Sequence, residues 1–168
     1  MSVAVIHEVA RPRLAVSPSV PHVFPFPAPA TLPPGGVLDI PVLVYGITAP
    51  IRKLTVSVHI RHEQIGLVAL NLQSPDGTGV VLSAFNGGGF ASYGASCAEP
   101  TVFDDEAADE ITQGPPPFAG AFRPQDSLST YCAKPLEAVT GRWYMIVNDA
   151  GLGKARARVL CAKLTIYI

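Results

Sequence analysis

Residues 54–82 read LTVSVHIRHEQIGLVALNLQSPDGTGVVL. Over residues 54–60 apolar and polar side chains alternate with a period of two, which predicts a half-buried β-strand. The alternation returns at residues 68–72. Residues 74–78, SPDGT, then predict a hairpin turn, because proline presets φ and the Asp-Gly pair accepts turn geometry with positive φ. With residues 80–82 as the return strand, the stretch predicts antiparallel β-structure.

Outside this stretch the chain continues as short strands separated by breaks. The mostly apolar run RWYMIV at residues 142–147 predicts a strand covered on both faces. A last strand is expected near residues 155–168, where the apolar positions change phase, and a β-bulge near residues 158–162 explains that change. No window has the pattern of a long amphipathic helix. Short strands with Gly and Pro turns predict an all-β fold, an antiparallel β-sandwich.

Length and composition limit the classes of protein to consider. The 168 residues suit one folded domain, and a chain with 48% apolar and 15% charged residues is too apolar for wholesale disorder. The net charge of −1 argues against nucleic acid or an anionic membrane as the partner. Apolar runs fall far short of the ~20 residues that a membrane-spanning helix needs. We therefore expect a protein partner.

The first part of the chain is rich in proline. Nine prolines fall within residues 11–41, and proline fixes φ and lacks an N–H. We therefore expect an extended, polyproline-II-like arm over residues 1–36, followed by the β-sandwich over residues 37–168. The arm is expected to lie on a partner protein or a neighbouring copy; the alternative is packing on its own domain. The expected anchoring residues are Val20, Val23, Phe24, Phe26 and Leu32.

The three cysteines are Cys97, Cys132 and Cys161, and none belongs to a CxxC pair. The N-terminal sequence lacks the basic and apolar regions of a secretory signal. Reduced, buried thiols are therefore the expected state. A Cys97–Cys132 disulfide is the alternative, and it depends on spacing alone.

Several short motifs occur together in an order that is typical of one known module. From residue 54 to residue 168 the sequence resembles the P domain (P/Homo B domain) that follows the catalytic domain in proprotein convertases and bacterial subtilisin-like proteases. The motifs are HEQIGLVALNLQSPDGT (62–78), TVFDDEA (101–107), FAGAFRP (118–124) and GRWYMIVNDAGLG (141–153).

The resemblance implies a jelly-roll β-sandwich with a stabilising or binding role, because the module is not catalytic in its family. It also implies that calcium is a candidate ligand, since some members bind it. Two positions depart from the family pattern. Leu67 stands where an acidic residue is usual, which weakens an inherited calcium site. Ala162 stands where the family has a tryptophan, so we expect a core repacked around Trp143 and Tyr167.

The acidic run DDEAADE, residues 104–110, holds five of the 13 acidic residues. Calcium prefers six to eight oxygen ligands, many of them carboxylates. The candidate ligands are Asp104, Asp105, Glu106 and Asp149. The alternative is a solvated loop that like-charge repulsion keeps open.

A basic run lies near the C-terminus. Lys154, Arg156 and Arg158 alternate, so in a strand they project from one face. We expect them to contact a neighbouring subunit, for instance its 104–110 loop. The alternative is a solvated edge strand protected by charge.

The sequence predicts no catalytic function. Around Ser92 it reads GGGFASYGA, which does not have the G-x-S-x-G spacing of a nucleophile elbow. His59 and His62 fall in and beside a strand, with no nucleophile placed to use them, and are expected to be structural.

Three functions fit these features. The first is a non-enzymatic structural subunit of a viral or phage particle, a capsid-decorating or spike-type homo-oligomer that is anchored by the arm and located in the virion. The second is a calcium-supported accessory module that acts with a separate subtilisin-like protease. The third is a carbohydrate-binding jelly roll that uses Phe90 and Tyr93 of the glycine-rich loop.

Overall fold

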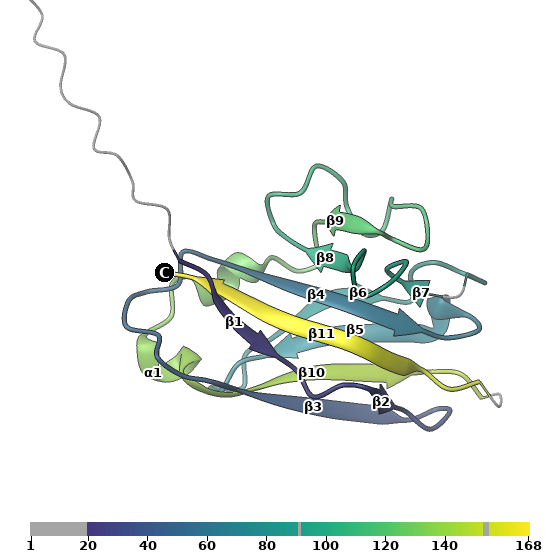
Figure 1. Ribbon diagram of the computed structural model, residues 1–168, viewed down its shortest axis with the longest axis horizontal. Helices are drawn as coiled ribbons and strands as arrows, with labels where there is room; N and C mark the ends of the chain where they lie inside the picture. The colour runs from purple at the N-terminus through teal and green to yellow at the C-terminus, as the bar shows by residue number, and fades with distance from the viewer. Residues whose placement is uncertain (1–19, 91, 153–154) are drawn as a thin grey trace, which may run out of the picture.

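The computed structural model describes residues 20–90, 92–152 and 155–168. Within these residues, eleven strands form two stacked layers, with β11 and β4 in one and β3 and β10 in the other (Figure 1). No described helix is both long and apolar enough to cross a membrane. The strands are β1 (His22–Pro25), β2 (Ala30–Thr31), β3 (Val37–Val44), β4 (Lys53–Arg61), β5 (Val68–Gln73), β6 (Gly79–Ala84), β7 (Ser92–Tyr93), β8 (Thr101–Phe103), β9 (Gly120–Phe122), β10 (Gly141–Asp149) and β11 (Arg158–Tyr167). The helices are η1 (Ile65–Leu67), η2 (Leu128–Tyr131) and α1 (Leu136–Val139).

The larger sheet has seven strands in the order β1-β11-β4-β8-β9, with β2 paired to β11 and β7 paired to β4. The smaller sheet has four strands in the order β3-β10-β5-β6. Strand pairing is antiparallel except between β8 and β9, which run parallel. The predicted all-β sandwich is confirmed.

Local turn chemistry places the β5–β6 hairpin where the sequence predicts it. The Asp76 carboxylate accepts hydrogen bonds from the Ser74 hydroxyl (2.6 Å) and the Thr78 amide (3.1 Å). Gly77 has φ +85°, a conformation that glycine adopts without steric cost. The predicted bulge in the last strand is also present, because the β11–β4 register shifts between Val159 and Cys161.

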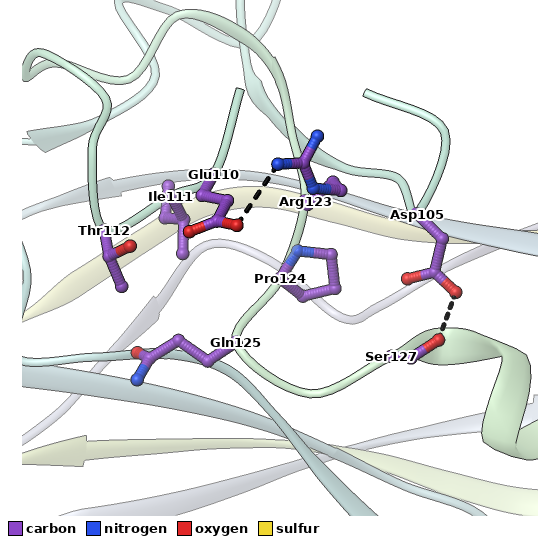
Figure 2. Close-up of a pocket in the computed structure, with 8 residues that line it drawn as sticks. All are labelled: Asp105, Glu110, Ile111, Thr112, Arg123, Pro124, Gln125 and Ser127. Atoms are coloured by element: carbon purple, nitrogen blue, oxygen red, sulfur yellow. Dashed lines mark hydrogen bonds and ion pairs between the residues drawn. The ribbon is translucent and has the colours of Figure 1, made fainter. Parts of the chain in front are cut away.

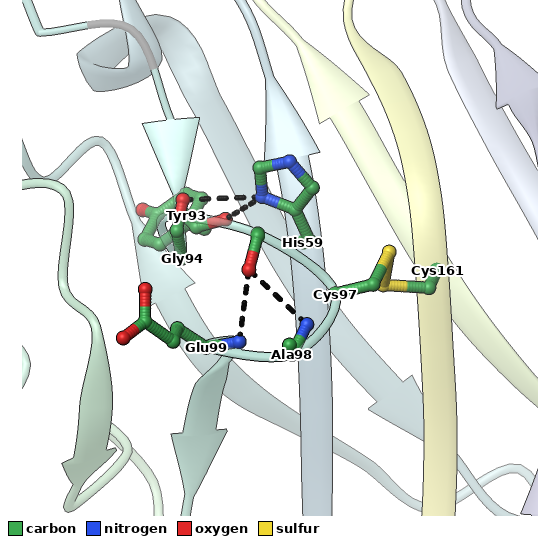
Figure 3. Close-up of a disulfide and its surroundings, with 8 residues drawn as sticks. His59, Tyr93, Gly94, Cys97, Ala98, Glu99 and Cys161 are labelled. Atoms are coloured by element: carbon green, nitrogen blue, oxygen red, sulfur yellow. Dashed lines mark hydrogen bonds between the residues drawn. A yellow bond between two sulfur atoms is a disulfide. The ribbon is translucent and has the colours of Figure 1, made fainter.

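β4 is more buried than its alternation predicts. The even residues 54–60 face the core, at most 2% exposed. Ser57 and His59 on the other face are also buried, at 8% and 6%. The segment between β7 and β8 buries these two residues, because it lies over their face of β4 (Figure 3). Both β7 and β8 pair with β4, and the His59 Nδ1 atom is 3.1 Å from the carbonyl oxygens of Tyr93 and Gly94.

β10 is less buried than its apolar run predicts, and the expected cover on both faces is wrong. Trp143, Met145 and Val147 on the inner face are fully buried, whereas Tyr144 and Ile146 on the outer face are only half-buried. The Trp143 ring lies edge-on to Tyr131, with the ring centroids 4.8 Å apart. Its indole N–H donates a hydrogen bond to the Val139 carbonyl (2.7 Å). Tyr167 lies half-buried at the end of β11.

Residues 1–19 of the predicted arm lie outside the described residues. The strands β1 and β2 within residues 22–32 are extended, and these residues belong to the sandwich. β1 and β2 pair with β11, and β1 is an outer strand of the larger sheet, where missing N–H groups of proline are tolerated. Phe24, Phe26 and Leu32, at 7%, 3% and 0% exposure, lie in the chain's own hydrophobic core. The prediction that these three anchor the chain to a partner is therefore wrong. Val20 and Val23 remain 76% and 52% exposed.

The cysteine prediction is corrected as well. Cys97 and Cys161 form a disulfide, and Cys132 is the free thiol. Cys161 lies opposite His59 on β4, and Cys97 reaches it from the segment that covers His59 (Figure 3). Spacing along the chain does not predict this pairing. In the sheet, β4 lies between the elements that carry the two cysteines, whereas in the sequence β4 precedes both of them.

Candidate functional site

The outer side of the four-stranded sheet carries a group of apolar residues. Pro41 lies opposite Tyr144, and Asp39 lies opposite Ile146, in the β3–β10 register. Partners in an antiparallel pair project from the same face, so these side chains form one surface. We call this surface the outer apolar face; its residues are Val37, Pro41, Leu43, Tyr144 and Ile146.

The outer apolar face is open to solvent along β3. Val37 and Leu43 are 60% and 59% exposed, and Tyr45, directly after β3, is 68% exposed. Scattered exposed apolar residues are ordinary, whereas residues brought together by strand register form a patch, and patches often mark contact sites. The run at residues 142–147 predicts burial on both sides because Tyr144 and Ile146 are apolar on its outer side, yet both remain only half-buried.

A pocket of about 430 Å³ lies beside the acidic loop (Figure 2). The Arg123 guanidinium donates hydrogen bonds to the carbonyls of Ala107 (2.7 Å) and Ala108 (2.6 Å) and lies 3.2 Å from the Glu110 carboxylate. At the other wall, Asp105 accepts hydrogen bonds from Ser127 and from two amides at the start of η2. The loop is therefore held closed by donors of the chain, and the expectation that repulsion keeps it open is wrong.

The four candidate calcium ligands do not form one group. Lys53, the first residue of β4, pairs with Asp104 (2.9 Å) and with Glu106. Asp149 lies beside His62, which directly follows the opposite end of β4. Within residues 20–90, 92–152 and 155–168, no group of three or more His, Cys, Asp or Glu side chains is arranged to hold a metal. A calcium site that combines all four residues is excluded by this placement.

His62 and Asp149 form a buried pair that the sequence did not reveal. The two side chains are 1% and 0% exposed, and the His62 Nε2 atom lies 3.3 Å from the Asp149 Oδ2 atom. Asp149 Oδ1 accepts a hydrogen bond from the Gly151 amide (2.9 Å). His62 Nδ1 lies against the Gln64 backbone. The pair therefore ties the turn after β4 to the end of β10, which is the structural role expected for His62.

The aromatic residues of the glycine-rich loop do not form a row on the surface. Tyr93 is completely buried, stacked on Phe118 at 5.2 Å, and burial raises its pKa to about 12. Phe90 is 60% exposed. Because Trp143 is also buried, the flat aromatic platform that a sugar ligand needs is not present among these three residues.

Two members of the basic run project outward together. Arg156 and Arg158 are exposed while Ala157 and Val159 are buried, although the strand begins only at Arg158. Lys154 lies outside the described residues. Sequence reasoning missed Arg61, which lies directly opposite Arg158 on β4.

Comparison with known families identifies part of the chain. Residues 51–102 match the model of the family described as Proprotein convertase P-domain. This segment is P-domain-like. The match runs from just before β4 to the middle of β8, so it includes the hairpin and the disulfide-bonded Cys97. The P-domain resemblance predicted from the sequence is confirmed over these residues.

Two solved structures are distantly similar to this chain. One is the serine protease of Aeromonas sobria, with 15% identity and a TM-score of 0.49 over 92% of this chain and 28% of that one. The other is the Aeromonas sobria serine protease in complex with the chaperone ORF2, with 15% identity and a TM-score of 0.44 over 88% and 27%. The chain thus spans little more than a quarter of either protein. No curated protein matches.

Proposed function

We propose that this chain is a non-catalytic accessory module that binds and stabilises a subtilisin-like protease domain. The observation that carries the proposal is the P-domain match over residues 51–102, because P domains accompany such proteases as non-catalytic modules. The match favours this function, the second of those predicted from the sequence. The virion function depended on an arm free to anchor elsewhere, and Phe24, Phe26 and Leu32 lie instead in the core.

The outer apolar face is the surface proposed to contact the protease domain. Its central residues, Tyr144 and Ile146, lie on β10, between β3 and β5, where a contact is rigidly positioned by both neighbouring strands. Burying apolar surface contributes about 25 cal/mol per Å² to the free energy of binding. Val37 and Leu43 are exposed in the isolated module, so a partner that covers them would gain this contribution. Two exposed charged residues also lie on this face, Arg142 opposite Leu43 and Asp39 opposite Ile146.

An oxidising compartment is part of this proposal. Disulfides persist in secreted and periplasmic proteins and are rare in the reducing cytosol. The Cys97–Cys161 bond therefore supports a site of action outside the cytosol.

The test is a binding measurement with a purified subtilisin-like catalytic domain from the same genome, beginning with one encoded beside this gene. We expect the module to form a defined complex by light scattering and to raise the melting temperature of the catalytic domain. Leu43→Glu and Ile146→Glu should weaken binding at least about tenfold, since each buries a charge in the contact.

The matched control is Val23→Glu, at an exposed apolar position on the other sheet. It should bind like the wild-type module. Equal weakening by all three variants would place the contact elsewhere, and no complex with any subtilisin-like domain of that genome would exclude the proposed function.

A further inference from the structure

A second pocket, of about 290 Å³, lies at the end of the larger sheet where β4 finishes and β11 starts. Its position on the other sheet separates it from the outer apolar face. Three of its six lining residues are arginines. The lining residues are Arg61, His62, Glu63, Arg156, Arg158 and Leu160.

Strand register brings two of these arginines face to face. Arg61 and Arg158 are Cα partners in the β4–β11 pair, so both side chains project from the same face. Like charges directly opposite one another destabilise a sheet unless an opposite charge lies between them. The same row continues with a hydroxyl residue on either side, Thr31 opposite Arg158 and Ser92 opposite Arg61.

The arginines of the pocket have no ion-pair partner within the described chain. Lys53, Lys134 and Arg123 each have a carboxylate within 4.0 Å, whereas Arg61, Arg156 and Arg158 have none. Glu63 is the acidic residue of the pocket wall, yet it does not pair with them.

The β-bulge gives the pocket an apolar wall. The register shift between Val159 and Cys161 leaves Leu160 as the extra residue, and it lies half-buried beside the arginines. An apolar neighbour keeps water from part of the site and strengthens charge interactions there.

We propose that this pocket binds an oxyanion, a phosphate, sulfate or carboxylate group held between the guanidinium groups of Arg61 and Arg158 with Arg156 beside them. The guanidinium fork matches the oxygen geometry of these groups and forms two parallel hydrogen bonds to them. The bound anion also removes the repulsion between the facing arginines. The inference does not depend on the proposed protease partner, because the two surfaces lie on different sheets.

The test is calorimetric titration of the full chain at low salt with four probes: inorganic phosphate, sulfate, a peptide with four consecutive glutamates, and the same peptide with glutamines. Arg61→Gln and Arg158→Gln should each weaken binding roughly tenfold, as expected for a lost hydrogen bond to a charged group. Arg52→Gln, at an exposed arginine directly before β4, is the matched control and should bind like wild type. Glu63→Gln should tighten binding, because it removes a negative charge from the pocket wall that repels an anion.

Binding of phosphate or sulfate that both pocket variants weaken assigns the site to free anions. Binding of the glutamate peptide alone, lost in the same variants, assigns it to an acidic segment of a protein. The proposal is overturned if no probe binds, if the glutamine peptide binds as well as the glutamate peptide, or if Arg52→Gln weakens binding as much as the pocket variants. Thermal melts of each variant without ligand show that the effect is not unfolding.

Discussion

His62 Nε2 and Asp149 Oδ2 face each other at 3.3 Å in the interior, and neither atom makes a hydrogen bond to any described residue. A buried ionisable pair is held by its surroundings, because removing water from a charge costs free energy that only a partner offsets. Here the surroundings are the end of β4, the Gly151 turn and the end of β10.

Asp149→Ala should lower the free energy of unfolding by about 3 kcal/mol, because it leaves the Gly151 amide without its acceptor and removes the carboxylate that faces His62. Asp149→Asn keeps the acceptor oxygen and should cost clearly less. The measurement is urea unfolding, with the exposed Asp109→Ala as a control expected to change stability by less than about 0.5 kcal/mol. Equal losses for Ala and Asn would show that the charge, and not the hydrogen bonding, matters.

Breaking the Cys97–Cys161 disulfide by double substitution with serine should cost about 2–4 kcal/mol, since the bond constrains the unfolded chain across a separation of 64 residues. Cys132→Ser removes a half-buried thiol outside the bond and should cost less. A thiol assay on unfolded, unreduced protein checks the pairing independently. One reactive thiol is expected, and three would contradict the bond.

The proline-rich segment should behave as part of the fold. Phe26→Ala removes a side chain that is 3% exposed and should lower stability by about 3–5 kcal/mol. Val23→Ala, at an exposed position on β1, should have little effect. Deleting residues 1–35 removes β1 and β2 and should prevent stable folding. Circular dichroism melts check all three; a truncated protein as stable as the full chain would show that the segment is dispensable.

Calcium should not change the melting temperature, because four of the five carboxylates of the acidic loop already have partners in the described chain. Asp105→Ala should cost about 0.5–2 kcal/mol, as expected for a lost helix cap, since Asp105 binds two amides at the start of η2. The same loss is expected with calcium and with a chelator. A loss that appears only with calcium present would instead make Asp105 a ligand.

Stability should fall as the pH rises from about 10 to about 12. Burial raises the pKa of Tyr93 to about 12, against about 10 when unfolded, so between these values the folded state holds a proton that the unfolded state has released. Tyr93→Phe should make this decline shallower, although Tyr131, whose pKa burial also raises, keeps part of it. Urea unfolding at pH 8, 10 and 11 checks this, with the exposed Tyr45→Phe as a control. An unchanged slope in Tyr93→Phe would refute the assignment.

The strands over residues 54–60 and 68–72, the SPDGT hairpin and the bulge in the last strand were all predictable. Each depends on a period of two or on turn residues that lie close together in the chain, so the information is local. The P-domain resemblance was predictable for the same reason, because its motifs are short and ordered along the chain.

Contacts between segments that are distant in the sequence determine which faces of the sheets are covered. They also determine which residues meet across neighbouring strands. His59 is buried because the segment that carries Cys97 lies over it, and Ile146 remains half-exposed although its strand is apolar on both sides. Strand register places Arg61 against Arg158 and Cys161 against His59, across separations that no local pattern records. The alternation of a strand shows that one face will be apolar; only the packed chain shows whether that face meets its own core or remains free for a partner.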